Sequence, residues 1–144
     1  MPLRIFPTPQ DAEAAFYEAL ERADLELMMA VWSEDEEIVC VHPGGSRLAG
    51  QDQVRESWRQ IFAGGASARL HVTQQVMITG TMVAVHSVQE NFSRPGEARP
   101  MQAVVATNVY LRTPAGWRMI VHHASPAPAQ PQPAPEDTSP KILH

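Results

Sequence analysis

Apolar residues recur at helical spacing in three segments of the first half of the chain. Thr8 and Pro9 favour a helix start, because threonine caps free backbone N–H groups and proline suits the first helical position. The stripe that follows consists of Ala12, Phe16, Ala19, Leu20 and Ala23. A second, short helix is expected after Asp24, and a third from about residue 50 to Gly64. The apolar side of the third consists of Val54, Trp58, Ile61 and Phe62.

The second half of the chain changes to a period of two, which is typical of strands. Strands are expected at 68–79, 81–93, 101–112 and 117–125, with an earlier short one at 38–42 that ends before Pro43. In the first of the long strands, alternation places Leu70, Val72, Val76 and Ile78 on one face. Short links between consecutive strands predict an antiparallel meander, and helices followed by strands indicate the α+β class. The strand at 101–112 is apolar at both alternations, which predicts that both of its faces are covered.

Composition limits the domain count and the classes of partner. A length of 144 residues fits one domain, and from residue 126 the sequence becomes rich in proline, so we expect a folded domain at 1–126 and a tail at 127–144. The net charge of -5 argues against nucleic acid as a partner. No apolar run reaches the roughly 20 residues that a membrane span needs, and Cys40 is the one cysteine. A cytoplasmic location, with no membrane partner, is the expectation.

Three local strings carry a resemblance to a known family. They are residues 23–35 (ADLELMMAVWSED), the turn at 42–45 (HPGG) with the helix that follows it, and the last strand at 116–126 (GWRMIVHHASP). The chain resembles the NTF2-like superfamily, and in particular its SnoaL-like branch. The resemblance implies an α+β cone, in which three N-terminal helices pack on the concave face of a strongly curved, mainly antiparallel sheet. It also implies a pocket between the two layers and a homodimer formed through the convex face.

Within this superfamily, the ketosteroid isomerase mechanism implies a set of catalytic positions. It uses a carboxylate base together with a tyrosine and a protonated aspartic acid that stabilise an oxyanion. Tyr17 and Asn108 match the tyrosine and the aspartic acid, and an asparagine amide can also donate to an oxyanion. The base position falls near Cys40 or His42, where no carboxylate stands, so His42 is the replacement and the isomerase activity itself does not carry over. The alternatives are a core role for Tyr17, a turn role for His42 and a small buried hydrophobe at Cys40.

Further residues are expected to line the pocket. They are Trp32, Trp58, His86, Tyr110, His122 and His123. Adjacent residues of a strand point to opposite faces, so one of His122 and His123 is expected to face the pocket and the other the outside. His86 is expected to face inward beside Gln89 or Glu90, depending on the strand register. The histidines lack the spacing of a zinc motif, so neither a metal nor a cofactor is expected.

Two functions follow from these observations. The first is a protein that binds a small apolar molecule in the cone, with acid–base catalysis of the isomerase, dehydratase or cyclase type. The second is a non-enzymatic association domain, because residues 117–126 also resemble the last strand of the association domain of a calmodulin-dependent kinase. A closed apolar pocket that brings Tyr17, His42 and Asn108 together favours the first.

Overall fold

Helices precede strands along the chain, as expected. The computed structural model describes residues 4–35, 37–65, 68–94, 96 and 102–128. Within them the order is α1 (Pro9–Arg22), α2 (Leu25–Val31), β1 (Val39–Val41), β2 (Arg47–Ala49), α3 (Gln51–Ala63), β3 (Arg69–Thr79), β4 (Val83–Ser93), β5 (Val104–Thr113) and β6 (Gly116–Pro126). The three helices and the five predicted strands are confirmed, and β2 is a short strand that the sequence pattern did not indicate. Most of the expected tail lies outside the described residues.

Local sequence signals explain the limits of α1. The Thr8 side chain accepts a hydrogen bond from the Asp11 backbone N–H at 3.0 Å, and Pro9 occupies the first helical position. The helix ends where Ala23 adopts the left-handed conformation, with φ 51°. Ala12, Phe16 and Ala19 of the predicted stripe are buried, so the stripe faces the sheet as expected.

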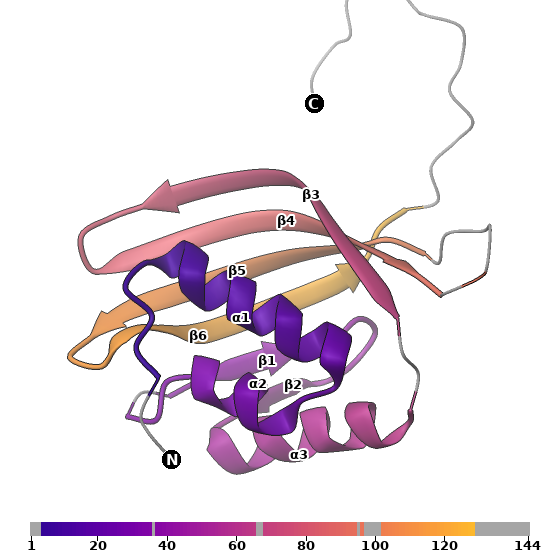
Figure 1. The fold of residues 1–144 in the computed structure, drawn as a ribbon, viewed down its shortest axis with the longest axis horizontal. Coiled ribbons are helices and arrows are strands. Elements are labelled where there is room, and N and C mark those ends of the chain that lie inside the picture. Colours follow the sequence, from indigo (N-terminus) through magenta and orange to yellow (C-terminus); the bar gives the residue numbers. More distant parts are fainter. Residues whose placement is uncertain (1–3, 36, 66–67, 95, 97–101, 129–144) are drawn as a thin grey trace, which may run out of the picture.

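Six strands of the described chain form one curved sheet in the order β2-β1-β6-β5-β4-β3. Strands β3 to β6 are an antiparallel meander, as predicted, whereas β1 pairs with β6 in parallel. Figure 1 shows α1 lying across one face of the curved sheet, with α2 and α3 beside β1 and β2. This arrangement is the expected α+β cone, and it encloses the inner, concave face of the sheet beneath α1.

The inner and outer faces of the sheet differ in burial. Alternate residues of β4 and β5 face inward and are buried: Ala84, His86, Val88, Glu90, Val104, Ala106, Asn108 and Tyr110. The outward residues between them include Val83 and Val105, which are exposed in the single chain. The inner face of β5 is therefore covered as predicted. A cover for its outer face stays a prediction.

The predicted alternation of β3 is wrong in its second half. The pairing with β4 shifts register between Thr73 and Val76, where Gln74 has a left-handed φ of 52°. This β-bulge inserts an extra residue, so every side chain after it moves to the other face. Leu70 and Val72 pack on the core, whereas Val76 and Ile78 lie exposed on the outer face.

The N-terminal segment is fastened to the start of β6. Phe6 forms an isolated bridge with Gly116, and its carbonyl accepts from the Trp117 N–H at 2.8 Å. The Arg118 guanidinium donates to the carbonyl of Ala30 at 2.7 Å and to that of Arg4, and it lies 5.1 Å from the centre of the Phe6 ring. These contacts hold the segment before α1 against the sheet. No helix of the described residues is both long and apolar enough to cross a bilayer.

Candidate functional site

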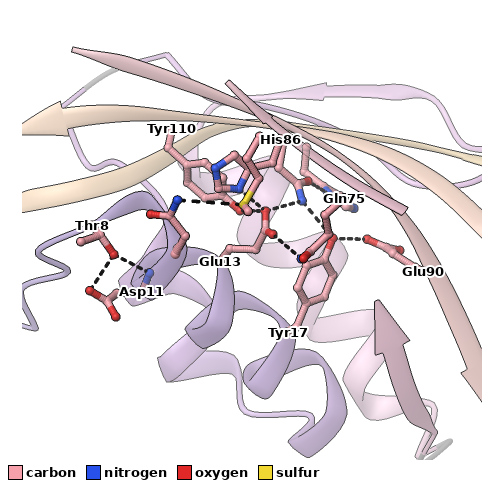
Figure 2. A network of polar contacts seen from close by, with 12 residues as sticks. Thr8, Asp11, Glu13, Tyr17, Gln75, His86, Glu90 and Tyr110 are labelled. Atoms are coloured by element: carbon pink, nitrogen blue, oxygen red, sulfur yellow. Dashed lines mark hydrogen bonds and ion pairs between the residues drawn. The ribbon is translucent and has the colours of Figure 1, made fainter. Parts of the chain in front are cut away.

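Seven polar side chains gather between α1 and the inner face of the sheet. We call them the inner network: Glu13, Tyr17, His86, Glu90, Asn108, Tyr110 and His122. All seven are buried. Figure 2 shows Glu13 at the centre of this group, with Tyr17 one helical turn further along α1. Burying so many polar groups is unfavourable unless they are paired, and here they pair with one another.

Glu13 is the point where most of the network meets. Its Oε2 accepts hydrogen bonds from Tyr110 Oη and His86 Nδ1, each at 2.8 Å, and from Asn108 Nδ2 at 3.4 Å. A carboxylate can only accept, so His86 donates from Nδ1, and its Nε2 has no partner among the described residues. The other oxygen, Oε1, has one donor among the described residues, Gln75 Nε2 at 3.4 Å. The two oxygens of this carboxylate therefore have very different surroundings.

Tyr17 joins the second carboxylate to the network. Its hydroxyl donates to Glu90 Oε2 at 2.7 Å and accepts from Asn108 Nδ2 at 2.9 Å. Burial raises the pKa of Glu90 to about 7; the Tyr17 hydrogen bond opposes the rise, and the charge of Glu13 adds to it. Burial and the nearby Glu90 charge raise the pKa of the Tyr17 hydroxyl, which therefore stays protonated. Glu90 is thus a carboxyl group that exchanges its proton near neutral pH.

His122 closes the network on β6. Its Nδ1 lies 2.6 Å from Asn108 Oδ1, which fixes this nitrogen as the donor, since the amide oxygen can only accept. Burial, and then the neighbouring His42 and His123, lower the pKa of His122 to about 3. The imidazole is therefore neutral at neutral pH. The Phe16 ring packs against it, with ring centres 4.8 Å apart.

A cleft of about 320 Å³ opens beside the network, between α1 and β3. We call it the α1–β3 cleft, and its lining residues are Gln10, Glu13, Ala14, Tyr17, Val72, Gln75 and Met77. Glu13 and Tyr17 thus belong both to the buried network and to the wall of the cleft. The exposed lining of the cleft is mainly apolar with a few polar groups, which is the usual character of a site for a small molecule.

The structure brings two of the three predicted catalytic residues together. Tyr17 and Asn108 are hydrogen-bonded to each other. Tyr17 lines the cleft, whereas Asn108 does not and contacts the far side of the Tyr17 hydroxyl. His42 stands apart: its Nε2 lies 2.9 Å from Ser57 Oγ, and its ring meets that of Trp58 edge-on. Burial lowers the pKa of His42. His42 is linked to the inner network through Trp58, which contacts both His42 and His122.

The predicted ligand-binding residues divide into three groups. His86, Tyr110 and His122 are members of the inner network, and Trp58 packs beside it. Trp32 is fully buried where α2 ends. His123 is exposed on the outer face, since adjacent residues of β6 point in opposite directions, as predicted for this pair. His123 therefore does not belong to the candidate site.

Three residues of the site were missed or left open by the sequence patterns. Glu13 was not singled out, although it lies four residues before Tyr17 and so shares a helix face with it. The choice between Gln89 and Glu90 was open, and the register of β4 places Glu90 inward, on the same face as His86. Gln75 reaches the site because of the β3 bulge, for which the sequence gives no signal. The carboxylates thus come from α1 and β4 rather than from β1.

The remaining chemistry of the described part is limited. Its residues hold no group of three or more His, Cys, Asp or Glu side chains arranged to bind a metal ion. Cys40 is buried, and burial followed by the charge of Glu90 raises the pKa of its thiol to about 12. The thiol therefore stays protonated and is a poor nucleophile.

Comparison with known proteins places the chain in a family. Residues 10–130 match the model of the SnoaL-like domain. A solved structure from Thiobacillus denitrificans, described as a candidate calcium/calmodulin-dependent protein kinase type II association domain, is 41% identical, with 87% of this chain and 99% of that chain covered and a TM-score of 0.82. A candidate dehydratase of the NTF2-like family from Streptomyces avermitilis is 35% identical, with 82% and 92% covered and a TM-score of 0.73.

More distant structures share the fold alone. An NTF2-like protein of unknown function from Pseudomonas putida is 17% identical, with 91% of this chain and 93% of that chain covered and a TM-score of 0.73. No curated protein matches the sequence significantly. The match to the family model and the two relatives above 30% identity agree with the three-helix, curved-sheet architecture. The chain belongs to the SnoaL-like domain family of NTF2-like proteins.

Proposed function

We propose that the protein binds a small, mostly apolar molecule in the α1–β3 cleft and performs acid–base chemistry on it with Glu13, Tyr17 and Glu90. The observation that carries this proposal is the inner network, which buries two carboxylates and reaches the cleft at Glu13 and Tyr17. An apolar pair of similar size would fill the same space at a lower desolvation cost, so the polar residues point to a chemical role.

Tyr17 has the surroundings of a switchable hydrogen-bond donor. While Glu90 is ionised, the Tyr17 hydrogen points to Glu90 Oε2. When Glu90 is protonated, its own O–H can donate to Tyr17 Oη, and the tyrosine hydrogen is then free to donate to a carbonyl oxygen in the cleft. A donor held in this way stabilises the negative charge that develops on such an oxygen. The Glu90 pKa of about 7 allows both states near neutral pH.

Glu13 supplies the base in this scheme. Its Oε1 takes a proton from the carbon next to the substrate carbonyl, and the resulting enolate oxygen is held by Tyr17. In a dehydration the proton on Glu13 then leaves with the β-hydroxyl group as water. In an isomerisation it returns to another carbon. The 35% identity to the candidate dehydratase from Streptomyces avermitilis supports this reaction class.

Proton exchange on a simple ketone and on the matching β-hydroxyketone tests the proposal. Cyclohexanone and 3-hydroxycyclohexanone are incubated with the protein in heavy water, and loss of the α-hydrogen signal is followed by proton NMR. We expect the wild type to accelerate the exchange and Tyr17→Phe to lose about 100-fold of that acceleration. Glu18→Gln, a change at an exposed α1 residue, is the matched control and keeps the wild-type rate. Equal rates in the wild type and Tyr17→Phe contradict the proposed acid–base role.

A second function has its own supporting observation. The outer face of the sheet carries exposed apolar side chains, among them Val76, Ile78, Val83 and Val105. The 41% identical relative from Thiobacillus denitrificans is described as a candidate association domain. We propose that this face forms a homodimer, and assembly of this kind is compatible with a small-molecule site on the opposite face.

A further inference from the structure

The α1–β3 cleft presents a hydrogen-bond acceptor that is only weakly occupied. Glu13 Oε2 has two partners at 2.8 Å and a third at 3.4 Å, so its bonding capacity is used inside the network. Within the described part of the chain, Glu13 Oε1 has one partner, Gln75 Nε2, at 3.4 Å. A carboxylate oxygen accepts about two hydrogen bonds, most favourably at 2.7–2.9 Å. Oε1 therefore has capacity for a closer and better donor than the Gln75 amide.

The Gln75 amide is held where it can be displaced. Gln75 lies in the β-bulge of β3, directly after Gln74 with its left-handed φ of 52°. β3 is one of the two edge strands of the described sheet, and Gln75 is exposed to solvent. A side chain with one long hydrogen bond at an exposed edge loses little when it moves aside and bonds to water instead. Figure 2 shows Gln75 on the strand side of the cleft, next to Tyr17 and Glu13.

The rest of the lining disfavours anions. Ala14, Val72 and Met77 supply an apolar wall, and none of the described lining residues is basic. While Glu90 is ionised, the Tyr17 hydrogen is engaged with it and is not offered to the cleft. A carboxylate or phosphate group bound in the cleft would lie beside Glu13 without a compensating positive charge, and the two negative charges would repel each other.

Resting on the proposed function, we propose that the cleft selects molecules that bear a hydrogen-bond donor, a hydroxyl or an ammonium group, on a short apolar body. The donor takes the place of the Gln75 amide on Glu13 Oε1, and the apolar body packs on Ala14, Val72 and Met77. Gln75 is then a specificity-determining residue, because it fills the donor position until such a molecule arrives. A β-hydroxyl group bound in this way also lies where Glu13 can protonate it as it leaves.

Three probes of matched length separate the donor from the apolar body: butylamine, butanol and butyrate. Each is titrated into isotope-labelled protein at about pH 8, where Glu90 is mostly ionised and butylamine is still protonated. Chemical-shift changes are followed at the backbone amides of Ala14, Gln75 and Met77. We expect butylamine and butanol to shift these amides, and butyrate to bind at least about fivefold more weakly.

Two variants assign the selectivity to individual atoms. Gln75→Ala removes the competing amide and is expected to tighten butylamine binding by about two- to tenfold. Glu13→Gln places an amide donor at the Oε1 position and is expected to reverse the order, so that butyrate binds better than butylamine. Gln60→Ala, which removes an exposed amide on α3 that bonds to Glu56 and lies outside the cleft lining, is the matched control and keeps the wild-type order. Thermal unfolding curves confirm that each variant is folded.

The outcomes distinguish this inference from the proposed function. If butyrate binds the wild type as tightly as butylamine, donor selection is wrong while the cleft remains a binding site. If none of the probes shifts the cleft amides, both proposals fall. Donor selection without any effect of Tyr17→Phe on proton exchange removes the acid–base proposal and leaves this inference standing. A Gln75→Ala variant that gains no butylamine affinity overturns the role of Gln75.

Discussion

Glu13 and Glu90 are both buried, with 5% and 3% of their surface exposed, yet their surroundings differ in kind. Glu13 is surrounded by donors from His86, Asn108 and Tyr110, whereas among the described residues Glu90 has the Tyr17 hydroxyl as its one side-chain donor. Burial without enough compensating donors favours the neutral form of a carboxyl group. At the scale of single residues, Glu90 is therefore the carboxyl group through which pH acts on this site.

Replacement of Glu90 by glutamine is expected to change how stability depends on pH. The folded-state pKa of about 7 lies above the ordinary value of 4.5, so the folded protein binds this proton more tightly than the unfolded chain does. The resulting stabilisation is complete below about pH 4.5 and is lost as the pH rises through 7. Relative to Glu90→Gln, the wild type should lose on the order of 3 kcal/mol of unfolding free energy across this window. Urea unfolding at a series of pH values measures the difference.

The comparison with the variant is needed because His122 acts in the opposite direction. Its folded-state pKa of about 3 lies below the ordinary 6.5, so its stabilisation is present above 6.5 and is lost as the pH falls through 3. Both proteins share this contribution, and it cancels in the difference. A wild-type curve parallel to that of Glu90→Gln would show that Glu90 ionises normally in the folded protein.

At the scale of helices and strands, the inner network shows which residues of a site the sequence patterns can predict and which they cannot. Tyr17 and Asn108, which were predicted from the isomerase mechanism, are hydrogen-bonded to each other. The alternation of β6 places His122 and His123 on opposite faces, as expected. Glu13 was not predicted because an acidic residue next to an apolar stripe normally belongs to the solvated side of a helix. Only the tertiary contact with His86 and Tyr110 makes its burial favourable, and no helical periodicity encodes that contact.

Strand β3 shows the same limit in a different form. Its alternation is regular in the sequence, and the bulge is formed by Gln74 and Gln75 without a glycine or proline to mark it. A non-glycine residue in the left-handed conformation costs roughly 1–2 kcal/mol, so it is not expected from propensity alone. The bulge turns Val76 and Ile78 outward, and it also leaves Gln75 in contact with Glu13.

The turn between β5 and β6 depends on Gly116. Its φ is +91°, and a Cβ there would lie 2.7 Å from the Phe6 carbonyl oxygen and 2.8 Å from the Phe6 nitrogen. Gly116→Ala therefore adds strain and a backbone clash at the point where the N-terminal segment meets β6. We expect a loss of about 2–4 kcal/mol in unfolding free energy, measured by urea denaturation.

Gly44→Ala is the matched control for this change. Gly44 has a similar φ of +74°, but nothing lies within 4 Å of the added Cβ, so only the conformational strain of about 1 kcal/mol applies. If Gly116→Ala is no less stable than Gly44→Ala, the Phe6–Gly116 bridge can shift without cost and contributes little to the free energy of unfolding.

At the scale of the whole molecule, the outer face of the sheet exposes apolar side chains in the single chain. Ile78 is 66% exposed and Val105 40% exposed in the single chain, and both lie on this face. We propose that a second copy covers it, so sedimentation should give about twice the monomer mass of 15.9 kDa. Val105→Glu places a charge on the central part of this face and is expected to give a monomer.

Ile61→Glu is the control for the charge itself, because Ile61 is 46% exposed on α3 and away from the sheet. That variant should sediment as the wild type does. If the wild type sediments as a monomer at micromolar concentration, the proposed dimer is wrong, and so is the proposed association function.

The parallel pairing of β1 with β6 sets the order in which the chain can fold. On one side β1 pairs with the nearby β2, whereas on its other side Val39, Cys40 and Val41 pair with Val121, His122 and His123. This second contact closes a loop that spans most of the domain. During synthesis, β1 leaves the ribosome long before β6 exists, and α1 to α3 have no completed sheet to cover. Such non-local pairings form late and slow the folding reaction. The apolar helix faces of the nascent chain therefore stay uncovered until the last strand has been synthesised, and uncovered apolar surface of this kind promotes aggregation.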